Sequence, residues 1–161
     1  MKYFLTTLLS CTLLMTACSA SSADNTHDIG KLRVSDVWAK ATPPQARVAG
    51  GYLSVQNRGD AADKLLRVES AVAASVEIHE MSDVGGVARM REVTNGVELP
   101  AGSTTTLKPG GYHLMFIEPK QPFVEGQTIK ATLVFEKAGS LPVVFDVRPL
   151  VASGSSGHDH H

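Results

Sequence analysis

Cysteine is almost absent from this sequence, and both cysteines lie near the amino terminus. The chain of 161 residues contains only Cys11 and Cys18, so the region after residue 18 has no thiol. This excludes from that region an internal disulfide, a cysteine nucleophile, a cysteine-based zinc site and a blue-copper site of two histidines and one cysteine. Any metal site there must be built from histidine, methionine, aspartate or glutamate.

Charge is also scarce. Charged side chains make up 19% of the chain and the formal net charge is −1, with no long basic run in the sequence. Nucleic acid is therefore not expected as a partner. The hydrophobic fraction of 43% is typical of a globular domain. The sequence shows no catalytic triad, paired-carboxylate site or phosphate loop, so we expect a protein that is not an enzyme.

The chain begins like an exported precursor. A basic residue precedes an apolar run over residues 3–14, which has the order of a secretory signal peptide and is too short for a membrane span of about 20 residues. The run ends in Met-Thr-Ala-Cys-Ser, which resembles a bacterial lipobox. We therefore expect a lipoprotein signal peptide at residues 1–17 and a periplasmic protein anchored to a membrane by lipidated Cys18. An ordinary signal peptide, cleaved after Ala17 or Ala20, is the alternative.

Composition divides the remainder into one domain with two polar flanks. Residues 18–31 are small and polar, which indicates a flexible tether. Residues 32–150 carry the hydrophobic pattern and are long enough to bury the core of a single domain. Residues 151–161 combine a Ser/Gly linker with the sequence His-Asp-His-His and are expected to form a flexible tail.

The pattern within residues 32–150 is that of an all-β domain. No window has a long amphipathic helical period, and short β-rich runs alternate with Gly- and Pro-containing turn signals. Many short strands with such turns predict a β-sandwich or a small barrel. The candidate strands are residues 33–39, 49–57, 64–70, 75–81, 87–93, 104–107, 112–118, 128–137 and 143–147.

All histidines and methionines of this domain lie between residues 79 and 115. They form two His-x-Met units, at 79–81 and at 113–115, with Met90 between the units. In a strand, residues i and i+2 point to the same face, so each unit presents an imidazole and a thioether together. A single strand methionine is usually core filler, but packing alone hardly explains five such residues in one stretch.

A hairpin within this stretch predicts one specific pairing. If the turn closes symmetrically about residues 84 and 85, His79 lies directly opposite Met90, and Met81 lies opposite Ala88. Opposed residues have Cβ atoms about 4.5–5.5 Å apart, although a β-bulge would shift this register. The hairpin alone does not bring the second His-x-Met unit to the first.

The donor types favour copper(I) over other metals. Thioether sulfur is a neutral, polarizable ligand that suits Cu(I), and imidazole completes the set. Zn²⁺ prefers cysteine, histidine or carboxylate, and Ca²⁺ and Mg²⁺ require oxygen ligands. A neutral ligand shell also suits a site that must release its ion, because little deprotonation accompanies binding.

Three segments carry a family resemblance. They read VEIHEM at residues 76–81, GVARMR at 86–91 and PGGYHLM at 109–115. Together with shorter segments at 37–44, 51–53 and 133–136, they resemble the periplasmic copper chaperones of the PCuAC family. The resemblance covers most of residues 33–148.

The resemblance implies a fold and a ligand set. The fold would be a cupredoxin-like antiparallel β-sandwich or Greek-key barrel with a Cu(I) site near its surface. Carried over by position, the four ligands would be His79, Met90, His113 and Met115, with Met81 as an auxiliary donor beside them. Histidine-rich tails of some relatives suggest further auxiliary ligands for Cu(II) at His158, His160 and His161, although a metal-free disordered end is the alternative.

The resemblance also implies a partner. The family delivers copper to the dinuclear centre of cytochrome c oxidase, located in its subunit II, directly or through a thiol-containing copper chaperone. Two other functions stay open: a cupredoxin-like electron-transfer protein, which the missing cysteine disfavours, and a metal-free β-sandwich binding module.

Overall fold

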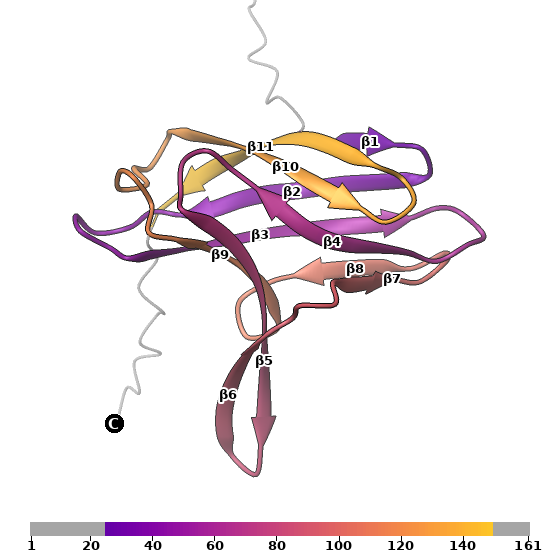
Figure 1. Cartoon of the computed structure of the whole chain (residues 1–161), viewed down its shortest axis with the longest axis horizontal. Helices are drawn as coiled ribbons and strands as arrows, with labels where there is room; N and C mark the ends of the chain where they lie inside the picture. Colours follow the sequence, from indigo (N-terminus) through magenta and orange to yellow (C-terminus); the bar gives the residue numbers. More distant parts are fainter. Residues whose placement is uncertain (1–24, 150–161) are drawn as a thin grey trace, which may run out of the picture.

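All regular structure in the protein's described region is β-strand. The computed structural model describes residues 25–149 (Figure 1), and the all-β prediction is confirmed. No helix long and apolar enough to cross a membrane occurs in this region. Its strands are β1 (His27–Ile29), β2 (Leu32–Lys40), β3 (Val48–Asn57), β4 (Asp63–Glu69), β5 (Ser75–Val84), β6 (Val87–Glu92), β7 (Val97–Leu99), β8 (Thr104–Leu107), β9 (Tyr112–Ile117), β10 (Thr128–Phe135) and β11 (Ser140–Arg148).

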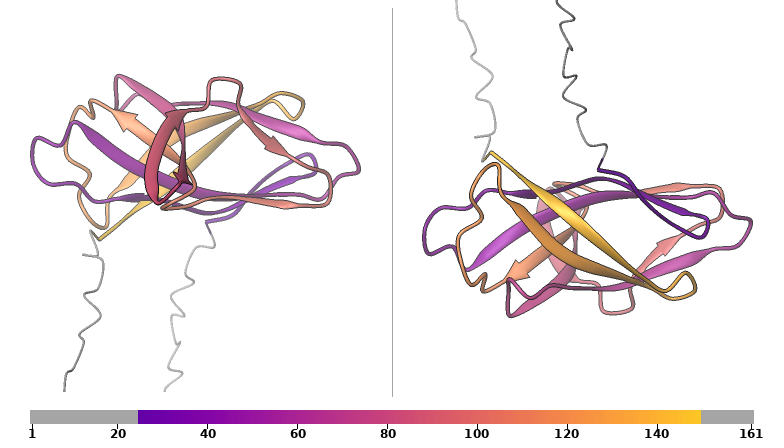
Figure 2. Two further views of the ribbon diagram at one scale, coloured as in Figure 1. Left: turned by 90° about the horizontal axis from the view of Figure 1, so that it is seen from below. Right: turned by 90° about the horizontal axis from the view of Figure 1, so that it is seen from above.

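The strands form one continuous sheet that curls around a common core. Their order is β6-β5-β9-β3-β2-β11-β10-β4-β7, with β1 paired to β2 and β8 paired to β3. Because β7 at one edge also contacts β8, the sheet curls into a flattened barrel, which Figure 2 shows from below and from above. The strand pairs are antiparallel, as expected, except for the pairing of β2 with β11, which is parallel.

Aromatic packing fills the core below the strands that carry the His-x-Met units. Phe116 of β9 is fully buried. Its ring meets Phe123 edge-on with centroids 5.3 Å apart and Phe145 of β11 with centroids 5.6 Å apart. Such edge-to-face contacts add to the free energy of burial, so β9 is firmly held on its inner face.

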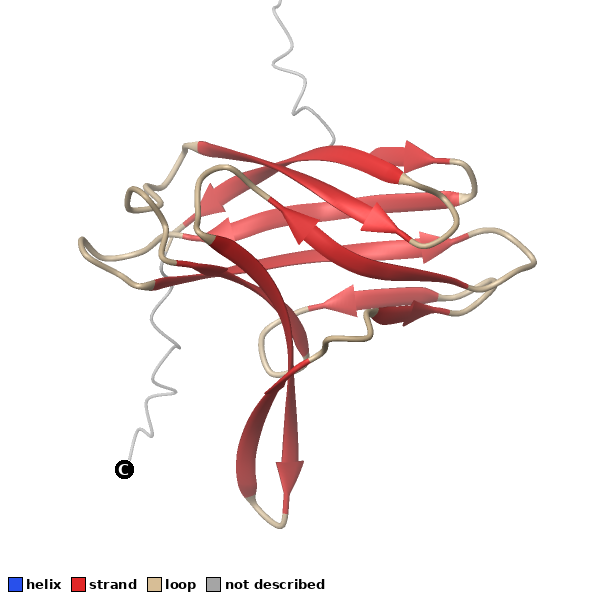
Figure 3. Ribbon diagram, in the orientation of Figure 1, coloured by secondary structure: helices blue, strands red, loops and turns tan. Residues whose placement is uncertain are grey.

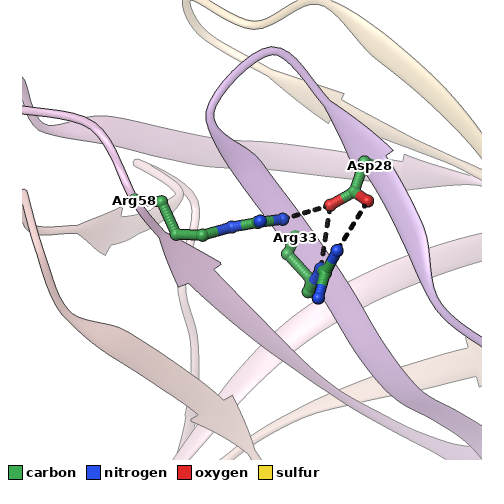
Figure 4. Close-up of polar contacts among 3 residues, drawn as sticks. All are labelled: Asp28, Arg33 and Arg58. Carbon is green, nitrogen blue, oxygen red and sulfur yellow. Dashed lines mark hydrogen bonds and ion pairs between the residues drawn. The ribbon is translucent and has the colours of Figure 1, made fainter.

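The folded domain begins earlier than the sequence indicated. Residues 27–29 lie in the segment 18–31, which was expected to be a flexible tether, but they form β1 and pair antiparallel with β2. Asp28 of β1 accepts hydrogen bonds from both Arg33 and Arg58 (Figure 4). The backbone ladder and these ion pairs hold a strand that is too short and polar to produce a hydrophobic pattern.

The β5–β6 hairpin projects from the body of the domain (Figures 1 and 3). Its two-residue loop is Gly85-Gly86, with φ of 65° and 80°. Positive φ at both loop positions is the requirement of a type I′ hairpin turn, and the β-branched Val84 would be strained in that conformation. The turn is therefore centred on the two glycines rather than on residues 84 and 85.

This turn corrects the predicted hairpin register. His79 pairs with Glu92, and Met81 pairs with Met90. The expected pairs of His79 with Met90 and of Met81 with Ala88 are therefore wrong. Because the shift is two residues along the partner strand, the same side chains remain on the same face.

Candidate metal centre

Two neighbouring strands bring both His-x-Met units onto one face. β5 pairs with β9 so that His79 lies opposite His113 and Glu77 lies opposite Met115. Directly opposed residues share a face, and residues two apart in a strand do so as well. Met81 therefore joins this face. The β5–β9 pairing supplies the tertiary contact that the hairpin could not.

The hairpin adds a second methionine from β6. Met90 lies opposite Met81, one same-face step beyond His79 toward the hairpin tip. It is thus a diagonal neighbour of His79, and diagonal neighbours about 7–8 Å apart are within reach of long side chains. The face carries two methionines on one side of the histidine pair and Met115 on the other side.

The two imidazoles have a spacing that one ion can bridge. The ring centroids of His79 and His113 are 5.9 Å apart, and the ring planes are inclined by 50°. Metal–imidazole bonds of about 2 Å place two rings on a shared ion with centroids roughly 5–6 Å apart. The side chain of His79 is only 13% exposed, whereas Met90 is 51% exposed. The site therefore has a covered side and an open side.

Hydrogen bonds hold one nitrogen of each ring. Nε2 of His79 lies 2.8 Å from Oε2 of Glu77, and Nδ1 of His113 lies 3.0 Å from the carbonyl oxygen of Gly111. Nδ1 of His79 is buried and has no hydrogen-bond partner. Buried polar atoms are rarely unpaired, so this nitrogen fits a position that a metal ion would occupy.

Sequence reasoning missed both hydrogen-bond acceptors. Glu77 is two residues before His79 and therefore lies on the same face of β5, which is a signal that the sequence contained. The carbonyl of Gly111 left no such signal, because a backbone atom can be assigned to a ring only when the turn before β9 is known.

The opposite face of the same three strands is tied together by polar side chains. Arg91 of β6 forms an ion pair with Glu80 of β5, and Glu80 also accepts a hydrogen bond from the hydroxyl of Tyr112 on β9. Burial, followed by this hydrogen bond, raises the pKa of Tyr112 above its usual value, so the phenol stays neutral at physiological pH. These contacts fix β6, β5 and β9 relative to one another.

The remaining predicted site residues lie outside residues 25–149. They are Cys18 of the proposed lipobox and the tail histidines His158, His160 and His161. Among the described residues, no group of three or more His, Cys, Asp or Glu side chains is arranged to hold a metal ion.

Comparison with known sequences identifies relatives over most of the chain. The family described as "Putative lipoprotein LpqE-like" matches residues 32–147. A protein of Leifsonia xyli subsp. xyli (strain CTCB07), also described as a "Putative lipoprotein", is 33% identical over 147 residues, which are 89% of this chain and 87% of the relative.

Solved structures show the same fold. The copper-bound PCuAC domain from PmoF2 has a TM-score of 0.64 at 27% identity, covering 77% of this chain and 97% of that domain. The apo PCuAC domain from PmoF1 has a TM-score of 0.66 at 30% identity, covering 77% and 98%. The Cu(I) form of a Deinococcus radiodurans protein in solution has a TM-score of 0.60 at 25% identity, covering 83% and 87%. The domain has the cupredoxin-like β fold, and the chain belongs to the LpqE-like, PCuAC-type family.

Proposed function

We propose that this protein is a copper chaperone that binds one Cu(I) ion through His79, Met90, His113 and Met115 and passes the ion to a partner protein. One observation carries the proposal. The two histidines are directly paired on neighbouring strands, and their face has methionines on both sides of the pair. The proposed protein binds and releases the copper ion and does not catalyse a reaction.

The donor chemistry supports Cu(I) as the cargo. Neutral thioether and imidazole ligands match the softness of Cu(I), and the unpaired Nδ1 of His79 offers a lone pair to the ion. Met81, which pairs with Met90, serves as an auxiliary donor. One relative of known structure is a copper-bound PCuAC domain, and the Deinococcus protein has a Cu(I) form.

The open side of the site suits transfer. Met90 is half exposed, so an acceptor's ligand can approach the ion from the hairpin side while His79 still holds it. We infer that the acceptor is a copper-receiving protein such as cytochrome c oxidase subunit II or a thiol-containing copper chaperone. Thiolate is a stronger ligand for Cu(I) than thioether, which would draw the ion forward.

Export and anchoring belong to the same proposal. Residues 1–17 act as a lipoprotein signal peptide, and Cys18 carries the lipid that holds the domain at a membrane facing the periplasm. Relatives described as lipoproteins support this assignment. The tail at residues 151–161 gathers Cu(II) loosely through its histidines.

A competition titration tests the site. The chain from residue 19 onward is titrated with Cu(I) without oxygen, against a chromophoric chelator, beside His113→Ala, Met90→Leu and the control His27→Ala. His27 lies in β1 and hydrogen-bonds Asn25, outside the His/Met face. We expect the wild-type chain to bind one Cu(I) ion tightly and the control to bind it equally well. The Cu(I) affinity of the two site variants should fall by at least about tenfold, because even changes to residues that only support metal ligands cost about 10–100-fold.

Two outcomes would contradict the proposal. If the chain binds no Cu(I), or if neither site substitution changes the Cu(I) affinity, the alternative of a metal-free binding module would be favoured. A strong visible band with reversible one-electron cycling would instead favour electron transfer.

A further inference from the structure

We propose that Glu77 is a positioning residue of the copper site, which makes His79 bind the ion through Nδ1 while His113 binds through Nε2. The inference rests on the proposed function, because it concerns how the same two histidines meet the ion. It assigns opposite tautomers to the two paired rings.

The argument for His79 begins with its hydrogen bond. Oε2 of Glu77 lies 2.8 Å from Nε2 of His79, and an ionised carboxylate only accepts hydrogen bonds, so Nε2 carries the proton. In a neutral imidazole the lone pair is then on Nδ1. This is the nitrogen that is buried without a partner, and coordination would satisfy it.

The argument for His113 follows the same logic with the nitrogens exchanged. The carbonyl of Gly111 lies 3.0 Å from Nδ1 of His113 and only accepts, so Nδ1 donates and Nε2 keeps the lone pair. The same carbonyl accepts the backbone N–H of Met81. The His113 ring is therefore oriented by main chain that the β5–β9 ladder already fixes.

The two rings differ in how replaceable their orienting group is. No substitution removes the backbone carbonyl of Gly111, whereas a substitution can remove the side chain of Glu77. The Glu77 side chain is 34% exposed and the His79 side chain 13% exposed. A hydrogen bond in such a partly water-excluded place is strengthened by the low local dielectric. Groups that orient metal-binding histidines typically account for 10–100-fold in metal affinity.

Glu92 provides a matched control. It lies opposite His79 on β6, so it places a carboxylate on the same face. Glu92 is exposed, whereas Glu77 holds the ring of His79. Glu92→Ala removes the same charge near the ion but leaves the Glu77 hydrogen bond in place.

The test reads the tautomers directly. Two-bond ¹H–¹⁵N correlation spectra of ¹⁵N-histidine-labelled chain from residue 19 onward are recorded before and after loading with Cu(I). We expect the proton on Nε2 of His79 and on Nδ1 of His113 without copper. Loading should shift Nδ1 of His79 and Nε2 of His113.

The variants separate orientation from charge. Glu77→Ala should give mixed tautomers at His79 and lower the Cu(I) affinity about 10–100-fold. Glu77→Gln, whose amide oxygen still accepts, should keep the single tautomer and lose less affinity. Glu92→Ala should keep the tautomer and change affinity by less than about threefold, as expected for an exposed charge.

Each contrary result has a distinct meaning. Copper bound through Nε2 of His79, or a Glu77→Ala variant that matches Glu92→Ala in tautomer and affinity, overturns the role of Glu77 alone. A wild-type chain that binds no Cu(I) overturns the proposed function together with this inference.

Discussion

Replacing Gly51 with alanine tests how closely β3 packs against β9. Gly51 lies opposite Leu114, and a Cβ atom at Gly51 would lie 2.7 Å from Cε2 of Phe116 and 3.3 Å from Cβ of Leu114. The first distance is too short for any carbon–carbon contact. Phe116 is held between Phe123 and Phe145, so its ring cannot move aside without disturbing the core.

The expected loss follows from two opposing effects. Overfilling a well-packed core costs about 1–3 kcal/mol. Replacing glycine with alanine restricts the unfolded chain, which offsets about 0.4–1 kcal/mol. Taken at the middle of both ranges, the free energy of unfolding should fall by about 1–2 kcal/mol. With an unfolding entropy of about 2.1 cal/mol/K per residue, the Tm of a domain of this size should fall by about 4–8 °C.

Urea and thermal unfolding, followed by the fluorescence of the single tryptophan, measure this change. Trp38 contacts Tyr52, with ring centroids 4.4 Å apart, beside the substituted position. The control is Gly111→Ala, where a Cβ atom meets nothing closer than 3.8 Å and where no stability should be lost and up to about 1 kcal/mol gained. Gly51→Ala as stable as the wild type, or Gly111→Ala equally destabilised, would refute the packing argument.

Three further predictions concern the buried face of β9, the methionine pair and the ion pairs of β1. Leu114 is fully buried on the face of β9 opposite the histidines. Leu114→Ala should therefore lower the free energy of unfolding, measured in urea titrations, by about 2–5 kcal/mol. A much smaller loss would contradict this assignment of the two faces of β9. Met81 and Met90 are directly paired, so each can partly replace the other's sulfur. Cu(I) titrations of Met81→Leu, Met90→Leu and the double variant should therefore show a combined loss larger than the sum of the single losses; additive losses would argue against shared ligation. The hydrogen bond from Arg33 is the largest influence that holds the pKa of Asp28 below its usual value. Its contribution to stability is therefore present near pH 7 and disappears as pH falls through the lowered folded-state pKa. Asp28→Asn should reduce stability slightly near pH 7, and the loss should shrink as acid protonates the carboxylate; a loss in urea unfolding that does not change with pH would show that charge is not the cause.

Much of the fold was predictable because apolar alternation and turn residues marked nine of the eleven strands found in residues 25–149. The two missed strands, His27–Ile29 and Val97–Leu99, have three residues each. Three residues are too few to show a period of two. They are held by neighbouring strands, which sequence spacing does not reveal.

The site was predictable only in part. Alternation within a strand placed each His-x-Met unit on one face, because that rule is local. The hairpin register was wrong because the steric demand of the Gly85-Gly86 loop was not weighed against a turn that included Val84. The pairing of β5 with β9 joins strands that are separated along the chain by β6, β7 and β8, and the sequence carries no local sign of it.

The parallel pairing of β2 with β11 affects the order in which the strands can assemble. Trp38 pairs with Asp146, so a strand near the beginning of the folded region needs the last strand as its partner. Until that last strand arrives, β2 presents an unpaired edge, and such long-range closure is slow. The barrel can therefore close only when β11 is present, and a chain that ends before Ser140 would leave this edge of β2 unpaired although it contains every proposed copper ligand from residue 79 to residue 115.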